Sequence, residues 1–384
     1  MKKRHTFFYT LIRPLAVLFV RFKFGYRYEI ARDLPDNYIV LSNHTTDYDV
    51  IFVAASFRRM MYVVGSEHIS RWPRAYKFLK YAFAPILRPK GTTASSTVKD
   101  MLRTLRAGNN VLLFAEGVRS WDGVSCPVLP STGKMIKTAR CGLVTYRIEG
   151  GYFASPMWSS SNTRRGRLKG APVGVYTAEQ LAAMSVEEVN RLIAQDLYED
   201  AYARQKESPA RYKGKNLAEK LENLLFICPE CGRMDSFHSH GDTVECASCG
   251  LNFRYTEYGM LEGGPFDNLK DFAAWQRARV AEAAERSETY TALGGKLIQV
   301  QKHSETPVAE GPVSMDEETF SCGDKRFAMT DVLDLAMHGK RTLVFSTPEG
   351  YFELVPSEEA NVLKFHLLYQ EYQKKAAACP SAAI

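Results

Sequence analysis

Residues 41–49 of this 384-residue chain, LSNHTTDYD, narrow the choice of fold more than any other stretch. The run before them, residues 37–41, is short and β-prone, and the run after them, residues 50–57, is apolar again. This pattern predicts a strand, then a loop that holds His44, then a helix that begins near Asp49. Because α/β sheets bind their ligands at such corners, the stretch predicts an α/β fold with a site at this corner.

His44 and Asp49 can act together only if the chain turns between them. Five residues along a straight helix would set two side chains roughly 140° apart, since each residue turns the helix by about 100°. With Asp49 in the first helical turn, its carboxylate reaches one ring nitrogen of His44 and suits the positive end of the helix. The other ring nitrogen is then placed to take a proton from a substrate hydroxyl. Such a pair also arises by chance, so this interpretation needs a second motif.

A second polar block follows a predicted buried strand at residues 111–114. It reads AEGVRS over residues 115–120. Arg119 is suited to grip a phosphate with two N–H groups, and Glu116 to orient the Arg119 side chain or to bind a substrate hydroxyl. Gly117 permits a tight turn between them. The alternative is a surface turn with an ordinary Glu–Arg pair.

In order and spacing, these blocks resemble three sequence blocks of the glycerolipid acyltransferase family, which includes the 1-acylglycerol-3-phosphate acyltransferases. The blocks are Asn43-His44 with Asp49, then Arg88 after an apolar strand, then residues 114–120. The likeness covers roughly residues 30–155, and three ordered blocks are more specific than any one. It implies a mixed sheet flanked by helices, with His44 as general base and Asp49 as its partner. It also implies an acceptor site made of Arg88, Glu116, Gly117 and Arg119.

The blocks on the acceptor side depart from the family pattern. The expected glycine is Ala82, the expected proline is Ala115 and the expected threonine is Val118. Residues 143–148, where a proline-containing strand is expected, contain no proline. The acceptor blocks therefore differ from the family more than the His44–Asp49 pair does.

The resemblance implies transfer of a fatty acyl group from a thioester, on coenzyme A or acyl carrier protein, to the free hydroxyl of 1-acylglycerol-3-phosphate. Two alternatives stay open. One is the same chemistry on a different lysophospholipid or hydroxylated lipid. The other is a non-catalytic, lipid-binding scaffold that keeps the fold.

The N-terminus is basic and apolar. Seven lysines and arginines precede Glu29, the first acidic residue, and surround apolar runs at residues 7–12 and 15–20. Arg13 and Pro14 separate the two runs, which are too short for a membrane span of about 20 apolar residues. Residues 1–28 are therefore predicted to form a helix in the surface of an anionic membrane, on its cytoplasmic face, which makes the protein peripheral or monotopic. A buried first helix, a true span and a secretory signal are the alternatives.

Four of the eight cysteines form two CxxC pairs, namely Cys228, Cys231, Cys246 and Cys249. This spacing predicts a four-cysteine ribbon over residues 226–258 that holds a structural zinc ion. The interval between the pairs has no lysine or arginine cluster, so a nucleic-acid partner is not expected. The scattered remaining cysteines fit a reducing, cytoplasmic compartment.

The rest of the chain divides into regions by its composition and its predicted secondary structure. The acyltransferase domain is expected over residues 29–225, with capping boxes at Thr177 and Ser185 and a second helix running to about Arg204. A basic segment, residues 164–169, is interpreted either as a solvated loop or as a surface for headgroups or nucleotide phosphates. A helical linker over residues 259–288 precedes a small β-rich domain over residues 289–384, similar to a pleckstrin-homology fold and closed by a final helix.

Overall fold

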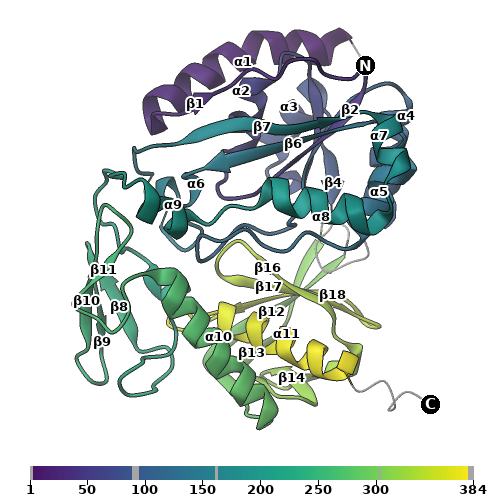
Figure 1. The fold of residues 1–384 in the computed structure, drawn as a ribbon. Helices are drawn as coiled ribbons and strands as arrows, with labels where there is room; N and C mark the ends of the chain where they lie inside the picture. Colours follow the sequence, from purple (N-terminus) through teal and green to yellow (C-terminus); the bar gives the residue numbers. More distant parts are fainter. Residues whose placement is uncertain (1–2, 89–94, 161–162, 302–303, 379–384) are drawn as a thin grey trace.

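The computed structural model of the chain describes residues 3–88, 95–160, 163–301 and 304–378. Figure 1 shows an N-terminal sheet with helices in the upper part of the view and a second sheet below it, with a small all-β unit to one side. The first sheet and its helices carry the predicted corner. They are described first.

The N-terminal sheet has seven strands in the order β1-β7-β6-β2-β5-β3-β4. Strands β2 to β6 are mutually parallel where they pair, whereas β7 runs antiparallel to β6, so the predicted mixed sheet is confirmed. Every residue of β2 is buried, as expected for a central strand covered on both faces. The strands are β1 (Arg27–Tyr28), β2 (Tyr38–Ser42), β3 (Met61–Ser66), β4 (Ile86–Arg88), β5 (Asn110–Phe114), β6 (Gly142–Glu149) and β7 (Lys169–Tyr176).

Helices cover both faces of this sheet. Alternate residues of β2 point to opposite sides, so Val40 packs in the core beneath α1 and α2, while Leu41 packs in a second core with α4, α5 and α8. The helices are α1 (Lys3–Phe24), α2 (Asp49–Ser56), α3 (Pro73–Ala82), α4 (Ser95–Arg106), α5 (Ser131–Ala139), α6 (Gly151–Ala154), α7 (Ala178–Ala183), α8 (Val186–Leu197) and α9 (Ala201–Glu207), with 3-10 turns η1 (Glu67–Arg71) and η2 (Leu221–Asn223).

Helix α1 runs through Pro14 without a break and lies along α2. Its inner face is fixed by polar contacts as well as apolar ones. Tyr9 donates its hydroxyl to Phe57 O at 2.8 Å, and the guanidinium of Arg13 donates to carbonyls in the last turn of α2. Arg13 thus donates to carbonyl oxygens at the C-terminus of α2, where intrahelical donors run out. The helix therefore packs on the fold along one face.

Both predicted capping boxes are present, at Thr177 for α7 and at Ser185 for α8. The second helix does not reach Arg204 as predicted, because α8 ends at Leu197 and α9 begins at Ala201. The reason is the side chain of Asp200, which accepts hydrogen bonds from the backbone N–H groups of the next turn and so starts a new helix.

The predicted ribbon region holds four short antiparallel strands, β8 (Phe237–His240), β9 (Thr243–Cys246), β10 (Asn252–Tyr255) and β11 (Leu261–Glu262). Helix α10 (Leu269–Glu285) follows and packs against the C-terminal helix α11 (Leu363–Ala378). Its side chain Gln276 is fully buried and accepts from the backbone N–H groups of Phe226 and Ile227. The region expected to link domains is thereby packed against both of its neighbours.

The C-terminal region forms one antiparallel sheet in the order β15-β14-β13-β12-β18-β17-β16, which α11 follows. This arrangement agrees with the β-rich region and final helix expected from the sequence. The likeness to a pleckstrin-homology fold stays a prediction. The buried face of α11 includes Phe365, Leu368, Tyr369 and Tyr372. The strands are β12 (Tyr290–Gln301), β13 (Ser304–Met315), β14 (Thr319–Cys322), β15 (Lys325–Ala328), β16 (Leu333–His338), β17 (Thr342–Thr347) and β18 (Gly350–Pro356).

Ser357 is followed by two glutamates, as a helix cap can be, but it does not cap the final helix. The helix begins at Leu363, where the side chain of Asn361 accepts from Lys364 N at 3.0 Å. Ser357 instead donates its backbone N–H to Gly294 O and so continues the pairing of the sheet. Asn361 is the better cap because its side-chain oxygen reaches a helical N–H while its own backbone N–H is held by Asp235.

Glu353, in β18, links the two sheets. Its carboxylate accepts from His68 Nε2 at 3.0 Å and from Arg71 Nη1 at 2.9 Å, both in η1 after β3. The ring of His68 also stacks on His338 of β16, with ring centroids 3.3 Å apart. Burial opposes ionisation, but the hydrogen bonds from His68 and Arg71 more than offset it and lower the pKa of Glu353 to about 2. The C-terminal domain is thereby held at the edge of the N-terminal sheet where β3 ends.

Glu353→Gln should lower the free energy of unfolding by about 2–3 kcal/mol at pH 7, because the partly buried Arg71 loses its counter-charge and the buried His68 loses its carboxylate partner. The folded pKa of Glu353 is depressed, so its contribution is present above its ordinary pKa of 4.5 and is lost as pH falls towards about 2. The difference between Glu353→Gln and the parent should therefore shrink by about half or more at pH 3. Denaturant unfolding across this pH range measures it.

Glu305→Gln is the matched control, because Glu305 also pairs with Arg71 but is half exposed. It should change stability by less than about 1 kcal/mol. An equal loss for Glu353→Gln at pH 7 and pH 3 would show that the carboxylate charge does not hold the two sheets together.

Candidate active site

The predicted strand-to-helix corner is present. Strand β2 ends at Ser42, α2 begins at Asp49, and His44 lies in the loop between them. The side chain of Asn43 fixes the start of this loop to β6, since its amide donates to Ile148 O at 2.9 Å and accepts from Ile148 N at 2.8 Å. The position of His44 is therefore set by the central strands of the sheet.

His44 and Asp49 are in contact, with 2.8 Å between Nδ1 and Oδ2. Asp49 is fully buried, and four further donors of the loop reach its two oxygens. Thr45 and Thr46 supply their backbone N–H groups at 2.6 and 2.9 Å and their hydroxyls at 3.3 and 2.7 Å. A buried carboxylate is costly unless its oxygens are hydrogen-bonded, and this loop meets that need.

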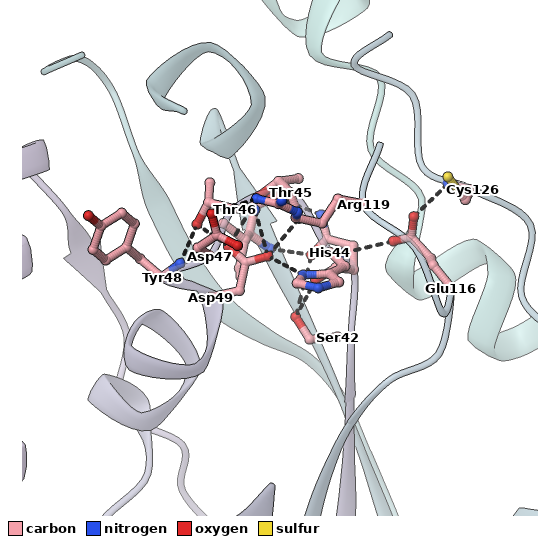
Figure 2. Close-up of polar contacts among 12 residues, drawn as sticks. Ser42, His44, Thr45, Thr46, Asp47, Tyr48, Asp49, Glu116, Arg119 and Cys126 are labelled. Atoms are coloured by element: carbon pink, nitrogen blue, oxygen red, sulfur yellow. Dashed lines mark hydrogen bonds and ion pairs between the residues drawn. The ribbon is translucent and has the colours of Figure 1, made fainter. Parts of the chain in front are cut away.

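The ring of His44 rests on Phe114, with ring centroids 4.3 Å apart and planes 20° from parallel. Its side chain is 25% exposed, so it stands at the surface of the sheet edge and not inside the core. Nδ1 is hydrogen-bonded to Asp49, whereas no protein group in the described part of the chain is hydrogen-bonded to Nε2. Figure 2 shows Asp49 on one side of the ring and Glu116 on the other. The geometry suits a base whose Nε2 faces a substrate.

Glu116 holds the His44 loop from the β5 side. Its Oε1 accepts from His44 N at 2.9 Å and its Oε2 accepts from Cys126 N at 2.6 Å. Burial raises the pKa of Glu116 to about 8, against the opposing effect of these two backbone donors. The structure therefore brings Glu116 to the backbone of the loop and does not pair it with Arg119. Gly117 has φ 72°, a left-handed conformation that glycine adopts without strain and that turns the chain after β5.

Arg119 lies on the far side of the same loop and pairs with Asp47, with 2.9 Å between Nη1 and Oδ2. The arginine side chain is 12% exposed and that of Asp47 is 75% exposed. An ion pair with so exposed a partner is weak, and the guanidinium has further N–H donors for an incoming anion. Ser120 N donates to His44 O at 3.1 Å, which ties this block to the base.

Arg88 ends β4 at the same edge of the sheet, because β4 runs parallel to β3 and hence to β5 and β2. Three strand spacings separate it from β2, or roughly 14 Å at about 4.8 Å per strand. The predicted site residues thus fall into two groups. The first group lies in or beside the loop between β2 and α2 and consists of His44, Asp49, Glu116, Gly117 and Arg119. The second is Arg88, which lies apart from the first group along the same edge.

Sequence reasoning missed three residues of this loop that now have clear contacts. Thr45 and Thr46 hold the Asp49 carboxylate, and Asp47 holds Arg119. The sequence did contain an indication of these contacts. The three residues lie between His44 and Asp49, and small polar side chains in such loops commonly bond to nearby backbone and carboxylate groups. The partner of Glu116, Cys126 N, had no such indication because any residue supplies a backbone N–H.

The four cysteines of the two CxxC pairs come together. Their sulfur atoms all lie within 4.8 Å of one another, with 3.6 Å between Cys228 and Cys249 and 3.9 Å between Cys231 and Cys246. In a tetrahedron with Zn–S bonds of about 2.3 Å, neighbouring sulfurs are about 3.8 Å apart. These separations fit a zinc ion and are too long for disulfides of about 2.05 Å. The cluster can hold a metal, and zinc as that metal stays a prediction.

The basic segment predicted at residues 164–169 is divided by the fold. Arg164 is buried, donates to Leu217 O, and its guanidinium lies over the rings of Trp158 and Tyr255, so it stabilises the core. The other cations of the segment line a cavity of about 780 Å³ near the end of α1. The charged residues of its lining are Arg21, Arg27, Glu149, Arg165, Arg167, Lys169 and Arg204. Lys169 and Arg204 also pair with carboxylates outside the lining, Glu29 and Glu199, and the remaining excess of arginines suits an anion.

Residues 26–149 match the family model described as Acyltransferase. This segment contains every predicted residue of the candidate active site, so the site lies within the part of the chain that resembles the family. The match supports acyltransferase activity for this part of the chain.

One similar solved structure is the 1-acyl-sn-glycerophosphate (LPA) acyltransferase, PlsC, from Thermotoga maritima. It is 16% identical, with a TM-score of 0.39, and the alignment covers 53% of this chain and 95% of that chain. No curated protein matches the chain.

Cys231→Ser should reduce the zinc content of the purified protein from about one ion per chain to a small fraction, because a closed four-sulfur site loses most of its affinity with one thiolate. Elemental analysis by mass spectrometry measures the loss, and limited proteolysis should then cut within residues 226–258. Cys322→Ser is the control, since Cys322 lies in β14 outside the cluster. Full zinc content in Cys231→Ser, or none in the parent, would remove the zinc assignment.

Proposed function

We propose that the protein is a membrane-surface acyltransferase. It moves a fatty acyl group from a thioester, on coenzyme A or acyl carrier protein, to the free hydroxyl of a lysophospholipid, with 1-acylglycerol-3-phosphate as the first acceptor to test. The observation that carries the proposal is the His44–Asp49 contact of 2.8 Å at the surface of a family-matched domain.

In this mechanism Nε2 of His44 takes the proton of the acceptor hydroxyl as the hydroxyl oxygen attacks the thioester carbonyl. A C–O ester bond forms, the C–S bond breaks, and the proton passes from His44 to the departing thiolate. Asp49 holds Nδ1 and stabilises the imidazolium charge between these steps. An acyl-enzyme is not needed, because the thioester is already activated and the acceptor is the nucleophile.

Arg119 is the residue best placed to bind the acceptor phosphate. It lies beside the His44 loop, and its carboxylate partner in the described chain, Asp47, is mostly exposed. Arg88 supplies a second cation on the same edge, while Glu116 and Gly117 shape the loop that holds the base. Binding by Arg119 places the acceptor hydroxyl near His44, which is the positioning that such a reaction requires.

The membrane part of the proposal rests on α1. Its outer face carries an exposed apolar stripe at the helical spacing of three and four residues, made of Phe7, Leu11, Leu15, Leu18 and Phe22. Phe8 contacts Phe78 and Tyr81 of α3, two further exposed aromatic side chains. Exposed apolar surface of this extent, flanked by basic residues, suits a bilayer interface. Among the described helices, none combines the length and apolarity needed to cross a bilayer.

The cationic cavity lies where α1 ends, since Arg21 and Gly25 are part of its lining. With the stripe of α1 in the acyl region of a leaflet, this cavity would face the anionic headgroups. The two features therefore support one orientation of the protein on a membrane surface.

His44→Ala should lower kcat by about a thousandfold or more, because the general base is lost, while zinc content stays unchanged. Arg119→Ala should mainly raise the KM for the acceptor. The assay follows thiol release from acyl-CoA that depends on added 1-acylglycerol-3-phosphate, with mass spectrometry of the lipid product from a mixture of acceptors.

His240→Ala is the matched control, because His240 is an exposed histidine in β8. Normal turnover by the His44→Ala protein would refute the mechanism. Lipid binding by the parent with no acceptor-dependent thiol release would instead favour the non-catalytic scaffold, and a product from another acceptor would change only the substrate.

Leu15→Glu combined with Phe22→Glu should weaken binding to anionic vesicles by about tenfold or more, since two exposed apolar side chains each lose the free energy of burial in the bilayer. Vesicle co-sedimentation measures the change. Leu293→Glu is the control, because Leu293 is 86% exposed in the C-terminal sheet. Equal binding by the double variant and the parent would show that α1 is not the membrane-binding face.

A further inference from the structure

The turn between β16 and β17 brings a residue of the C-terminal domain to the candidate active site. In Figure 1 these two strands lie on the side of their sheet that faces the N-terminal domain. Lys340, at the tip of the turn, donates its Nζ to Ser159 O in the segment after α6. Lys340 is also close enough to Arg119 and Asp47 for their charges to act on it.

Lys340 is a partly buried cation near a second cation, Arg119, and the carboxylate near both is Asp47. Burial lowers the pKa of Lys340, the charge of Arg119 lowers it further, and Asp47 opposes both. Asp47 already pairs with Arg119 and is mostly exposed, so one weak carboxylate serves two cations. An ammonium has three N–H donors, and the carbonyl of Ser159 uses one of them. The positive charge here therefore exceeds the negative charge, which suits the binding of an anion.

The turn is held firmly enough to act as part of a site. His338, two residues before Lys340, stacks on His68 of the N-terminal domain. Arg341, the next residue, donates to Ser357 O and Glu358 O. With both flanks fixed, the ammonium is presented in one place and loses little freedom when a ligand binds.

We propose that Lys340 is an acceptor-binding residue, which together with Arg119 holds the phosphate monoester of the lysophospholipid beside His44. The proposal rests on the function proposed above and deepens it. It assigns to the C-terminal domain a part of the acceptor site that lies outside the family-matched residues 26–149. A phosphate monoester fits because it offers several acceptor oxygens and about two negative charges, enough for an ammonium and a guanidinium at once.

The test is Lys340→Gln, which keeps an N–H donor for Ser159 O and removes only the charge. The KM for the phosphate-bearing acceptor, 1-acylglycerol-3-phosphate, should rise about tenfold, as expected for the loss of one charge-assisted hydrogen bond, while kcat stays within about twofold. The KM for an acceptor without phosphate, a monoacylglycerol, should not change. Lys340→Arg should restore most of the affinity for the phosphate. Lys296→Gln, at an exposed lysine of β12, is the matched control.

A second measurement needs no turnover. Calorimetric binding of a short-chain 1-acylglycerol-3-phosphate below its micelle concentration should be about tenfold weaker for Lys340→Gln than for the parent. If the parent shows no acyl transfer, the proposed function fails, and this titration still decides the role of Lys340.

Three results would overturn the inference. The first is equal acceptor affinity in Lys340→Gln and the parent. The second is a rise in the KM for the thioester alone, which would assign the ammonium to the phosphates of the donor. The third is a fall in melting temperature and kcat that Lys340→Arg does not rescue, because this result would identify the contact with Ser159 as purely structural.

Discussion

The buried carboxylate of Asp49 is the group on which the candidate site depends. It is fully buried, and five donors from the loop just before it converge on its oxygens. Desolvation of that charge is costly, and the loop offsets the cost only in the conformation that brings its N–H groups inward. The same bonds fix the ring of His44. The same loop conformation therefore both buries the carboxylate of Asp49 and aligns the ring of His44.

That conformation is stable because the sheet holds the loop from both sides. Asn43 bonds to β6 through Ile148, and Glu116 bonds to the His44 backbone from the end of β5. The backbone at Gly151, just after β6, also lies close to the loop, since a Cβ atom at Gly151 would lie 2.1 Å from Oγ1 of Thr45. Strands β5 and β6 flank β2 directly, so the parallel order of the sheet is what allows both supports to reach one loop.

Sequence alone predicted features that depend on neighbours in the chain. The corner at His44, the contact with Asp49 and the two capping boxes arise within a few residues and were confirmed. The pairing of Arg119 with Asp47 instead of Glu116 was missed, because it depends on how two loops meet. Strand β13 contains Pro307 and Gly311, two residue types that are disfavoured inside strands, so its sequence is a weak indication of a strand. Pro307 is tolerated because its part of the strand pairs only with β12 in the described sheet, which leaves its missing N–H on an edge.

The appended C-terminal domain acts at the edge where an open α/β sheet binds its ligands. Glu353 and Lys340 belong to the same three-stranded part of its sheet, β16, β17 and β18, so the contact that docks the domain also positions the ammonium. Loss of the charge on Glu353 would release η1 and, with it, the stack of His68 on His338 next to the turn. In the proposed enzyme, acceptor binding is thereby coupled to domain docking. The base in the loop after β2 and a cation from the other domain meet only while the two sheets remain in contact.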